Sequence, residues 1–239
     1  MRKYIKYGGL LFLLIEIVLL YGFSSHRNGR KKVTDINIKF QREGKGFLTH
    51  KMVNKLLIQN QKSIKNQAKR VIDLQRLEQN MLNNPYVEKA TVFLTVDGRL
   101  QTNIKQREPI ARIVTSPKVY YIDNQGVRIP LSDNYSARVP LISGVTTKND
   151  IQQITELLHI ILKNDFLRKE IVGIRKSAKE EFIFDVRSGN YKIEFGKMKD
   201  ATIKFKKLIA LYNKTFEDKT IKIYKKINLK YHNQVVCTK

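Results

Sequence analysis

Apolar residues form one long run near the start of the chain, Gly8–Phe23, with basic residues on both sides. Its 16 residues would form a helix of roughly 24 Å, which is short for a hydrocarbon core of about 30 Å. Eleven of them are Leu, Ile, Val or Phe, whose favourable insertion outweighs the cost of the one charged residue, Glu16. The run therefore predicts a transmembrane helix.

A cleavable signal peptide would also begin with basic residues followed by an apolar segment. The small-residue cleavage site of such a peptide is missing, because the chain continues with the polar sequence Ser24–Gly29. We therefore expect an uncleaved anchor, with residues 1–7 before it and a basic linker, 24–32, after it. Both flanks are basic, so charge leaves the orientation open. The shortness of residues 1–7 favours an N-terminus inside the cell.

Beyond the anchor, periodic apolar residues predict one strand and two helices. Val33–Phe40 alternates as a strand does, whereas residues 49–59 and 71–82 have helical spacing. Thr49 is placed to cap the first helix. Asn83-Asn84-Pro85 ends the second helix, because the residue before a proline is pushed out of the helical region.

The clearest local pattern is a pair of alternating runs, residues 90–96 and 100–104, joined by Asp97-Gly98. Asp-Gly between two such runs predicts a β-hairpin with a type I′ turn, in which both central residues have positive φ. One face of the hairpin is apolar, so we expect the two preceding helices to cover it. The order strand, helix, helix, strand, strand predicts a compact α+β domain over residues 33–114.

Thr115-Ser116-Pro117 marks a boundary, and residues 115–239 are expected to form a second domain. We predict a mainly antiparallel β domain with two helices, the first capped by Asp150 and the second, which is basic, at about residues 200–213. The predicted strands are Val119–Ile122, Val127–Leu131, Ile171–Arg175, Glu181–Val186, Tyr191–Phe195, Lys219–Tyr231 and Gln234–Val236. The fold class of the chain is therefore α+β behind an N-terminal transmembrane helix.

The chain carries 46 Lys and Arg against 21 Asp and Glu, a formal charge of +25. This excess has two explanations: an anionic partner, or a solvated surface drawn from a Lys-rich composition. We favour the second, because the basic residues are spread along the whole chain. The densest clusters are Lys204–Lys207 on the second predicted helix and Arg27–Lys32 beside the anchor. The latter predicts an anionic lipid contact through Arg27, Arg30, Lys31 and Lys32.

The sequence gives no support for catalysis, a cofactor or a metal site. The histidines His26, His50, His159 and His232 fall in four different elements, and the one cysteine, Cys237, excludes a disulfide framework. Phosphate-binding, dinucleotide-binding and serine-nucleophile motifs are missing from the sequence. Nucleic acid is not expected as a partner either, because zinc-finger, RRM and helix-turn-helix patterns are missing too.

Five short segments carry a further signal: Asn84–Ala90, Ile104–Ala111, Tyr121–Gly126, Val139–Gly144 and Ile227–Val236. Their order and residues are similar to motifs of the bacterial cell-division family FtsQ/DivIB, which the chain resembles over nearly its whole length. Gln106 stands where the family usually has Glu, and Asn228 and Lys230 depart from its terminal Asp-Leu-Arg-Tyr-x-Asn strand. The resemblance implies that the first domain is a POTRA domain and the second the family's β domain.

The resemblance implies a non-enzymatic scaffold of the divisome that links early and late division proteins at the septum. It also implies a single-pass protein of the inner membrane, with the N-terminus inside and the bulk extracytoplasmic. In the family the last strand binds FtsB, which pairs with FtsL, by β-augmentation of an open sheet edge. The matching partner-binding residues here are Leu229, Tyr231, Asn233, Val235 and Val236. Alternatively, these residues only complete the sheet and pack its core.

Three further alternatives stay open at this point. Glu16 either contacts a polar group on a partner helix within the membrane or is simply tolerated there. The chain could instead be a single-pass envelope protein whose basic domain binds an anionic polymer or nucleic acid, in which case binding would collapse between about 50 and 200 mM salt. A more remote class is the outer-membrane assembly factors with POTRA units, but the sequence has no barrel-sized series of alternating strands.

Overall fold

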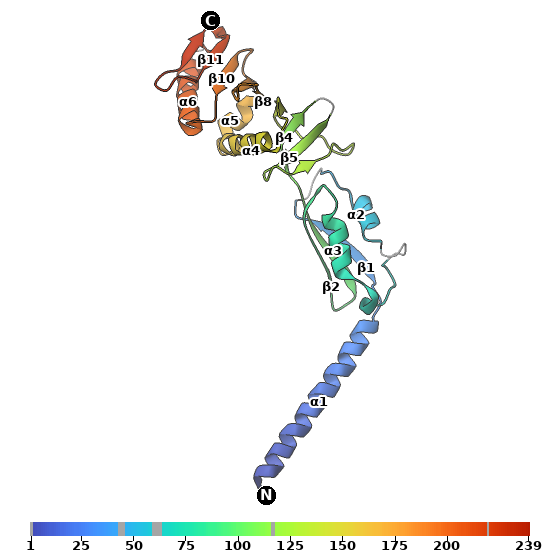
Figure 1. Ribbon diagram of the computed structural model, residues 1–239. Coiled ribbons are helices and arrows are strands. Elements are labelled where there is room, and N and C mark those ends of the chain that lie inside the picture. Colours follow the sequence, from blue (N-terminus) through green and yellow to red (C-terminus); the bar gives the residue numbers. More distant parts are fainter. Residues whose placement is uncertain (1, 43–45, 59–63, 116–117, 219) are drawn as a thin grey trace. The chain divides into compact units, whose positions relative to one another are not determined.

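The computed structural model describes residues 2–42, 46–58, 64–115, 118–218 and 220–239 (Figure 1). The chain divides into two compact units, Met1–Gln106 and Arg107–Lys239. Each unit has its own core of buried apolar side chains.

The first unit begins with one long helix, α1 (Arg2–Arg30). The segment of residues 9–30 is long and apolar enough to cross a membrane, and none of its apolar window is buried within the structure. The helix extends past the predicted anchor, Gly8–Phe23, at both ends, so most of the segment that we predicted as a linker is helical. This extension is favourable because a helix that has already nucleated gains one hydrogen bond for each added residue.

The rest of the first unit packs two helices against a small sheet. The order is β1 (Asp35–Phe40), α2 (His50–Leu56), the 3₁₀ helix η1 (Lys69–Val71), α3 (Leu74–Leu82), β2 (Val87–Leu94) and β3 (Arg99–Gln106). Strand β3 lies between β1, which runs parallel to it, and β2, which runs antiparallel. Apolar side chains of α2 and α3 share one core with alternate strand residues: Val53, Leu57, Leu77, Met81, Val92, Leu100 and Ile104. The predicted covering of the hairpin by helices is confirmed.

Local details of the first unit confirm one prediction and correct another. The Thr49 side chain accepts a hydrogen bond from the Met52 amide and so caps α2, as expected. The hairpin turn is not type I′, because φ is positive at Gly98 and not at Asp97. Instead, the Gly98 amide donates to Thr95 O at 3.2 Å, which makes a longer loop over residues 95–98. The end expected for α2, residue 59, lies outside the described residues.

In the second unit, nine strands of the described chain form one sheet, in the order β12-β11-β10-β9-β8-β7-β4-β5-β6. Neighbours are antiparallel except for three parallel pairs, so the sheet is mixed but mainly antiparallel. The strands are β4 (Pro109–Val114), β5 (Val119–Asp123), β6 (Arg128–Ile129), β7 (Leu141–Ser143), β8 (Ile171–Lys176), β9 (Phe182–Val186), β10 (Lys192–Gly196), β11 (Lys226–Asn228) and β12 (Val236–Thr238).

The boundary between the units lies earlier than we predicted. We expected the first domain to end near Val114, but β4 pairs with β5 and β7 of the second unit. The division therefore falls between Gln106 and Arg107. The expected boundary residues Ser116 and Pro117 lie outside the described residues.

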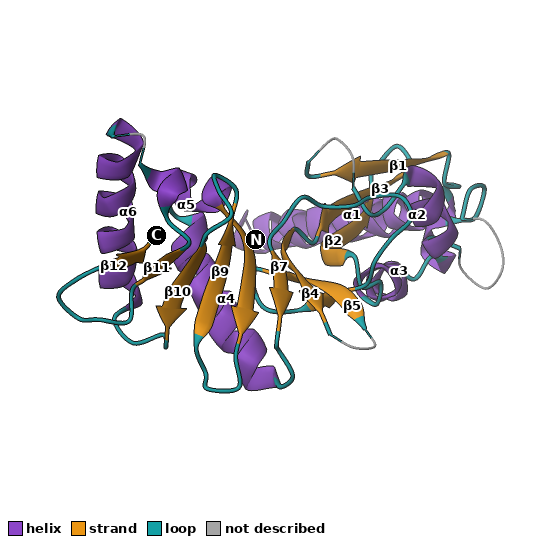
Figure 2. Ribbon diagram, turned by 90° about the horizontal axis from the view of Figure 1, so that it is seen from above, coloured by secondary structure: helices purple, strands orange, loops and turns teal. Residues whose placement is uncertain are grey.

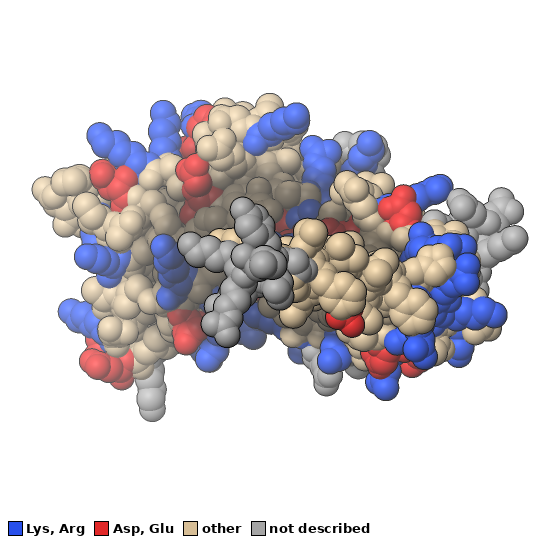
Figure 3. Space-filling view, turned by 90° about the horizontal axis from the view of Figure 1, so that it is seen from below, with Lys and Arg blue, Asp and Glu red and all other residues tan. Residues whose placement is uncertain are grey.

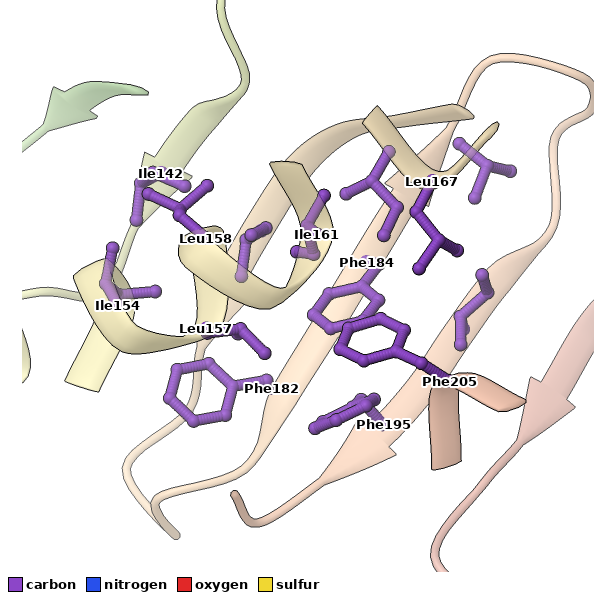
Figure 4. Close-up of a cluster of buried hydrophobic side chains, with 14 of the residues drawn as sticks. Ile142, Ile154, Leu157, Leu158, Ile161, Leu167, Phe182, Phe184, Phe195 and Phe205 are labelled. Carbon is purple, nitrogen blue, oxygen red and sulfur yellow. The ribbon is translucent and has the colours of Figure 1, made fainter. Parts of the chain in front are cut away.

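Helices α4 (Lys148–Leu162), α5 (Asp165–Glu170) and α6 (Ala201–Glu217) share one core with the sheet. Figure 2 shows α4 lying across one side of the strands. In Figure 4 the rings of Phe184, Phe195 and Phe205 lie together, with centroids 4.9 Å apart from Phe184 to Phe195 and from Phe195 to Phe205. Alternate residues of β9 and β10 are buried here, so the helices cover one face, and the other face carries Ile183, Asp185, Lys192 and Glu194.

Two corrections concern the helices of this unit. Helix α5 was not predicted, because six residues are too few to establish a helical period. Asp150 does not cap α4. Thr147 does, and Asp150 lies in the first turn, where its carboxylate accepts hydrogen bonds from the Thr146 and Thr147 amides at 2.8 Å each.

Candidate functional site

The sheet of the second unit ends in a strand with one neighbour. Within the residues that the structure describes, β12 pairs with β11 and with no other strand. The backbone N–H and C=O groups on its outer side are therefore available to an added strand. We call Val236–Thr238 the C-terminal edge.

The five residues expected to bind a partner divide into two groups. Leu229 is fully buried, and its amide donates to Glu194 O at 2.9 Å, so it extends the pairing of β11 with β10. Val235 is partly buried against the core. Tyr231 (51% exposed) and Asn233 lie in the turn before β12, and Val236 is exposed within β12. The exposed group lies at or next to the C-terminal edge, whereas Leu229 belongs to the core.

A basic pocket of about 460 Å³ lies beside Tyr231. The described residues that line it are Glu181, Gly196, Lys197, Lys199, Asp200, Ile203, Lys204, Lys207, Lys230, Tyr231 and His232. Five of these side chains are lysines and two are acidic, so the pocket has a net positive charge. We call it the basic pocket.

Lys204 forms part of this pocket from the first turn of α6. Its side chain is nine-tenths buried, and its ammonium donates to Phe195 O at 3.0 Å and Lys197 O at 2.7 Å. The ammonium also lies 4.9 Å from the centre of the Phe195 ring. Among the described residues no carboxylate forms a salt bridge with it, and burial lowers its pKa. The ammonium of Lys204 therefore contacts only neutral groups directly, although the nearby carboxylates of Asp200 and Glu181 partly offset the effect of burial.

Two other lysines fix the turn that carries Tyr231. The Lys207 ammonium donates to Tyr231 O at 2.8 Å and to His232 O at 2.9 Å, which joins α6 to this turn. The Lys230 ammonium donates to Glu181 at 2.7 Å. This hydrogen bond raises the pKa of Lys230 and lowers the pKa of Glu181. The backbone that carries the exposed Tyr231 ring is therefore held by a contact to α6 and by the contact of Lys230 to Glu181, which precedes β9.

A buried cluster of ionisable side chains in the second unit, Glu170, Tyr191 and Tyr212, stabilises the fold. Glu170 accepts hydrogen bonds from Ser188 and from Tyr212 (3.2 Å), and the Tyr191 hydroxyl donates to the Tyr212 hydroxyl at 2.8 Å. Burial raises the pKa of Tyr191 to about 12, so this phenol is a poor nucleophile. Burial likewise raises the pKa of Cys237 in β12. Among the described residues, no three His, Cys, Asp or Glu side chains are grouped as metal ligands would be.

Several residues of the sequence motifs hold turns. Asp123 accepts hydrogen bonds from the amides of Gln125 and Val127 at 2.9 Å each, and from the Arg107 guanidinium at 2.6 Å. Gln106 accepts the Leu48 amide at 2.9 Å through its side-chain oxygen, a contact that a Glu could also make. These motifs therefore mark the fold rather than a reactive centre.

The remaining candidate, Glu16, lies in α1 with an exposed side chain. In the described chain it has no hydrogen-bond or ion-pair partner.

The basic pocket was only partly visible in the sequence, as the cluster Lys204–Lys207. Its other residues come from the position before β9, from the end of β10 and the segment that leads into α6, and from the turn before β12, and no local pattern joins these segments.

Comparison with known proteins assigns a family to each unit. Residues 108–238 match a family model described as FtsQ/DivIB, C-terminal related. Residues 31–105 match a model described as POTRA-like domain. None of the curated proteins matches the chain. The two matched ranges lie within the two compact units.

Proposed function

The chain belongs to the FtsQ/DivIB C-terminal related family, and on this premise we propose that it binds FtsB-like and FtsL-like division proteins through its C-terminal edge. The family is a membrane-anchored, non-enzymatic scaffold family of cell division, and the POTRA-like unit agrees with that membership. The observation that carries the proposal is the unpaired side of β12, with the exposed Tyr231 and the basic pocket beside it.

Strand addition to so short an edge is weak by itself. Strand β12 has three residues, which offer about two or three outward backbone groups at about 1 kcal/mol net for each hydrogen bond. Side-chain contacts must supply the remaining affinity. The Tyr231 ring and Val236 provide apolar surface at the edge, and aromatic residues are frequent anchors of protein interfaces.

The charge of the basic pocket indicates the chemistry of the partner. A carboxylate that entered it would meet Lys204, which forms no salt bridge with a described carboxylate, together with the exposed Lys197 and Lys199. Complementary charges across an interface strengthen specificity and association rate. We expect the bound segment to place an acidic residue in the pocket and an apolar residue over Tyr231.

The proposed placement is single-pass in the cytoplasmic membrane at the division septum, with residues 1–7 inside and the chain that follows α1 outside. Helix α1 has the length and composition for the span. Arg27, Arg30, Lys31 and Lys32 would contact anionic lipid headgroups, and Glu16 would contact a polar group of a partner helix. If Glu16→Leu leaves partner recruitment unchanged, the contact proposed for Glu16 does not exist.

Affinity measurements on the full chain test the proposed edge. The double variant Tyr231→Ala and Val236→Glu should weaken binding of FtsB–FtsL by at least about tenfold, because it removes an aromatic anchor and adds an unpaired charge. Leu141→Ala is the matched control, since Leu141 is 52% exposed on β7 of the same sheet and Tyr231 is 51% exposed. A folded double variant that binds as tightly as the parent chain would contradict the proposal.

Charge reversal tests the basic pocket separately. Lys199→Glu should weaken partner binding, whereas Lys148→Glu, in a second pocket at the start of α4, should leave it unchanged. An anionic polymer or nucleic acid would respond differently: the Lys and Arg side chains in Figure 3 are spread over the face with acidic residues between them. Binding to such a polymer would weaken about equally in both variants and would collapse in moderate salt.

A further inference from the structure

The POTRA-like unit exposes two apolar side chains at the end where α1 meets it. Outside α1, the most exposed large apolar residues of the described chain are Val96 (77%) and Val71 (60%). Val96 lies in the β2–β3 loop, and Val71 is the last residue of η1. Single exposed valines are ordinary, but these two belong to segments that are joined to the same point of α1.

Lys69 makes that junction. Its ammonium donates to the Asn28 side chain of α1 at 3.1 Å, to Thr95 O at 2.7 Å and to Val96 O at 2.9 Å. Its amide also donates to Lys31 O at 2.9 Å, just after α1 ends. The end of α1, η1 and the hairpin loop are therefore held together.

This end of the unit is strongly basic. It carries Arg27, Arg30, Lys31, Lys32, Lys69 and Arg70. No described carboxylate forms a salt bridge with Arg27, Arg30, Lys31, Lys32 or Arg70, and Asp97 in the hairpin loop pairs with Arg99 at 2.9 Å. Burial and then the neighbouring charge of Lys31 lower the pKa of Lys69, and Asp97 partly offsets them. Such a surface favours an anionic partner.

The height of this end of the POTRA-like unit above the membrane follows from the length of α1 beyond its apolar run. The apolar run ends at Phe23, and Asn28 lies five residues further along an unbroken helix, about 7 to 8 Å along its axis. The headgroup layer outside a hydrocarbon core of about 30 Å is about 5 to 8 Å thick on each side. Because the apolar run is about 6 Å shorter than that core, a centred run ends about 3 Å inside it, and the segments joined at Asn28 lie about 4 to 5 Å above the core, within the headgroup layer.

We propose that the membrane-facing end of the POTRA-like unit, formed by residues 27–32, η1 with Val71, and the loop with Val96, binds the anionic phospholipid headgroups of the membrane that α1 spans. The two valines enter the interface, and the basic residues contact lipid phosphates. This inference rests on the membrane anchoring proposed above and extends it, because the folded domain itself becomes a lipid-binding module. The lipid contact would fix the unit against the membrane.

The test uses the full chain with Cys237→Ser, reconstituted into vesicles and labelled at Val96→Cys with an environment-sensitive fluorophore. The matched control carries the label at Lys89→Cys, an exposed position on the same hairpin. Lys89 lies seven residues before Val96, roughly 20 Å along the strand. Headgroup contact is read as quenching by lipids that carry a spin label in the headgroup, in neutral phosphatidylcholine vesicles and in vesicles with phosphatidylglycerol.

With phosphatidylglycerol, we expect quenching at position 96 to be several-fold stronger than at position 89. It should fall in neutral vesicles, in high salt and in the variant Arg30→Gln, Lys31→Gln, Arg70→Gln, since each basic residue near such a surface contributes about fivefold in affinity. Equal quenching at the two positions, or equal quenching at position 96 in both vesicle types, would overturn the inference. Flotation with the vesicles reports the anchor independently: its loss contradicts the anchoring, whereas flotation with equal quenching overturns only the headgroup contact.

Discussion

Gly144 is the position where a single methyl group should damage the second unit most. Its φ is +77°, and a Cβ built on it would lie 2.0 Å from Lys176 O and 3.0 Å from Lys176 C. The left-handed backbone alone costs a non-glycine residue about 1 to 2 kcal/mol. The overlap with the β8 backbone cannot be relieved by a side-chain rotation, so Gly144→Ala must also separate the parallel pair β7–β8.

The expected cost of Gly144→Ala is therefore well above the backbone strain, at least about 3 kcal/mol, which is a large part of the 5–15 kcal/mol that stabilises a typical domain. Gly126→Ala is the matched control. Its φ is +75°, but a Cβ there would lie 3.2 Å from the Thr155 hydroxyl and 3.4 Å from Ile151 Cγ2, which are side-chain atoms, so the steric cost added to the backbone strain is smaller. Both glycines end sequence motifs, and only Gly144 presses against the backbone of another strand.

The two variants are compared by urea unfolding, followed by tyrosine fluorescence because the chain has no tryptophan, and by amide exchange in β8. Gly144→Ala should unfold at lower urea and expose β8 amides, whereas Gly126→Ala should shift the midpoint by a third to a half as much. Equal shifts for the two variants would refute the assignment of Gly144 as a point of backbone contact.

Three further predictions concern stability. Asp150 is buried and paired with Lys176, so Asp150→Asn should lower the free energy of unfolding by about 3 to 5 kcal/mol. An unchanged midpoint in thermal or urea unfolding would contradict this. Burial alone would raise the pKa of Asp150, but its hydrogen bonds from Lys176, Thr146 and Thr147 lower it well below the usual 3.8. The stabilisation by the Asp150 carboxylate is therefore complete above about pH 4 and is lost as the pH falls further. Asp150→Asn should accordingly flatten the acid side of a profile of melting temperature against pH. Leu229→Ala should lower the free energy of unfolding by about 2 to 5 kcal/mol because Leu229 is fully buried. Tyr231→Ala should leave the melting temperature nearly unchanged, because the Tyr231 side chain is exposed. A larger loss for Tyr231→Ala than for Leu229→Ala would contradict the assignment of Leu229 to the core and of Tyr231 to the edge.

The elements of the first unit were largely predictable because their contacts are local. Alternation in β2 and β3 and helical spacing in α3 are visible within ten residues, and Thr49 caps α2 as its position indicated. The turn was not predictable in type, because Asp97-Gly98 fits two kinds of loop and the contacts of Thr95 decide between them. Local patterns thus identified the elements better than their ends.

The unit boundary and the basic pocket were less accessible because both depend on distant pairing. Strand β4 follows β3 almost directly, and only its pairing with β5 and β7 shows that it belongs to the second unit. The pocket joins Lys197, Lys204 and Lys230, which come from the end of β10, from α6 and from the turn before β12. The burial of Leu229 was hidden for the same reason, because its side chain packs into the core of the second unit while its amide pairs with Glu194 O.

Amide hydrogen exchange of the full chain, with and without FtsB–FtsL, distinguishes strand addition from other modes of binding. The same sheet supplies an internal control, since β6 (Arg128–Ile129) is the strand at its other end. Partner binding should slow exchange at residues 236–238 by at least about tenfold, as new backbone hydrogen bonds form, and should leave β6 unchanged. A complex that forms without protection at the C-terminal edge, or with protection at β6 instead, would contradict the proposed binding mode.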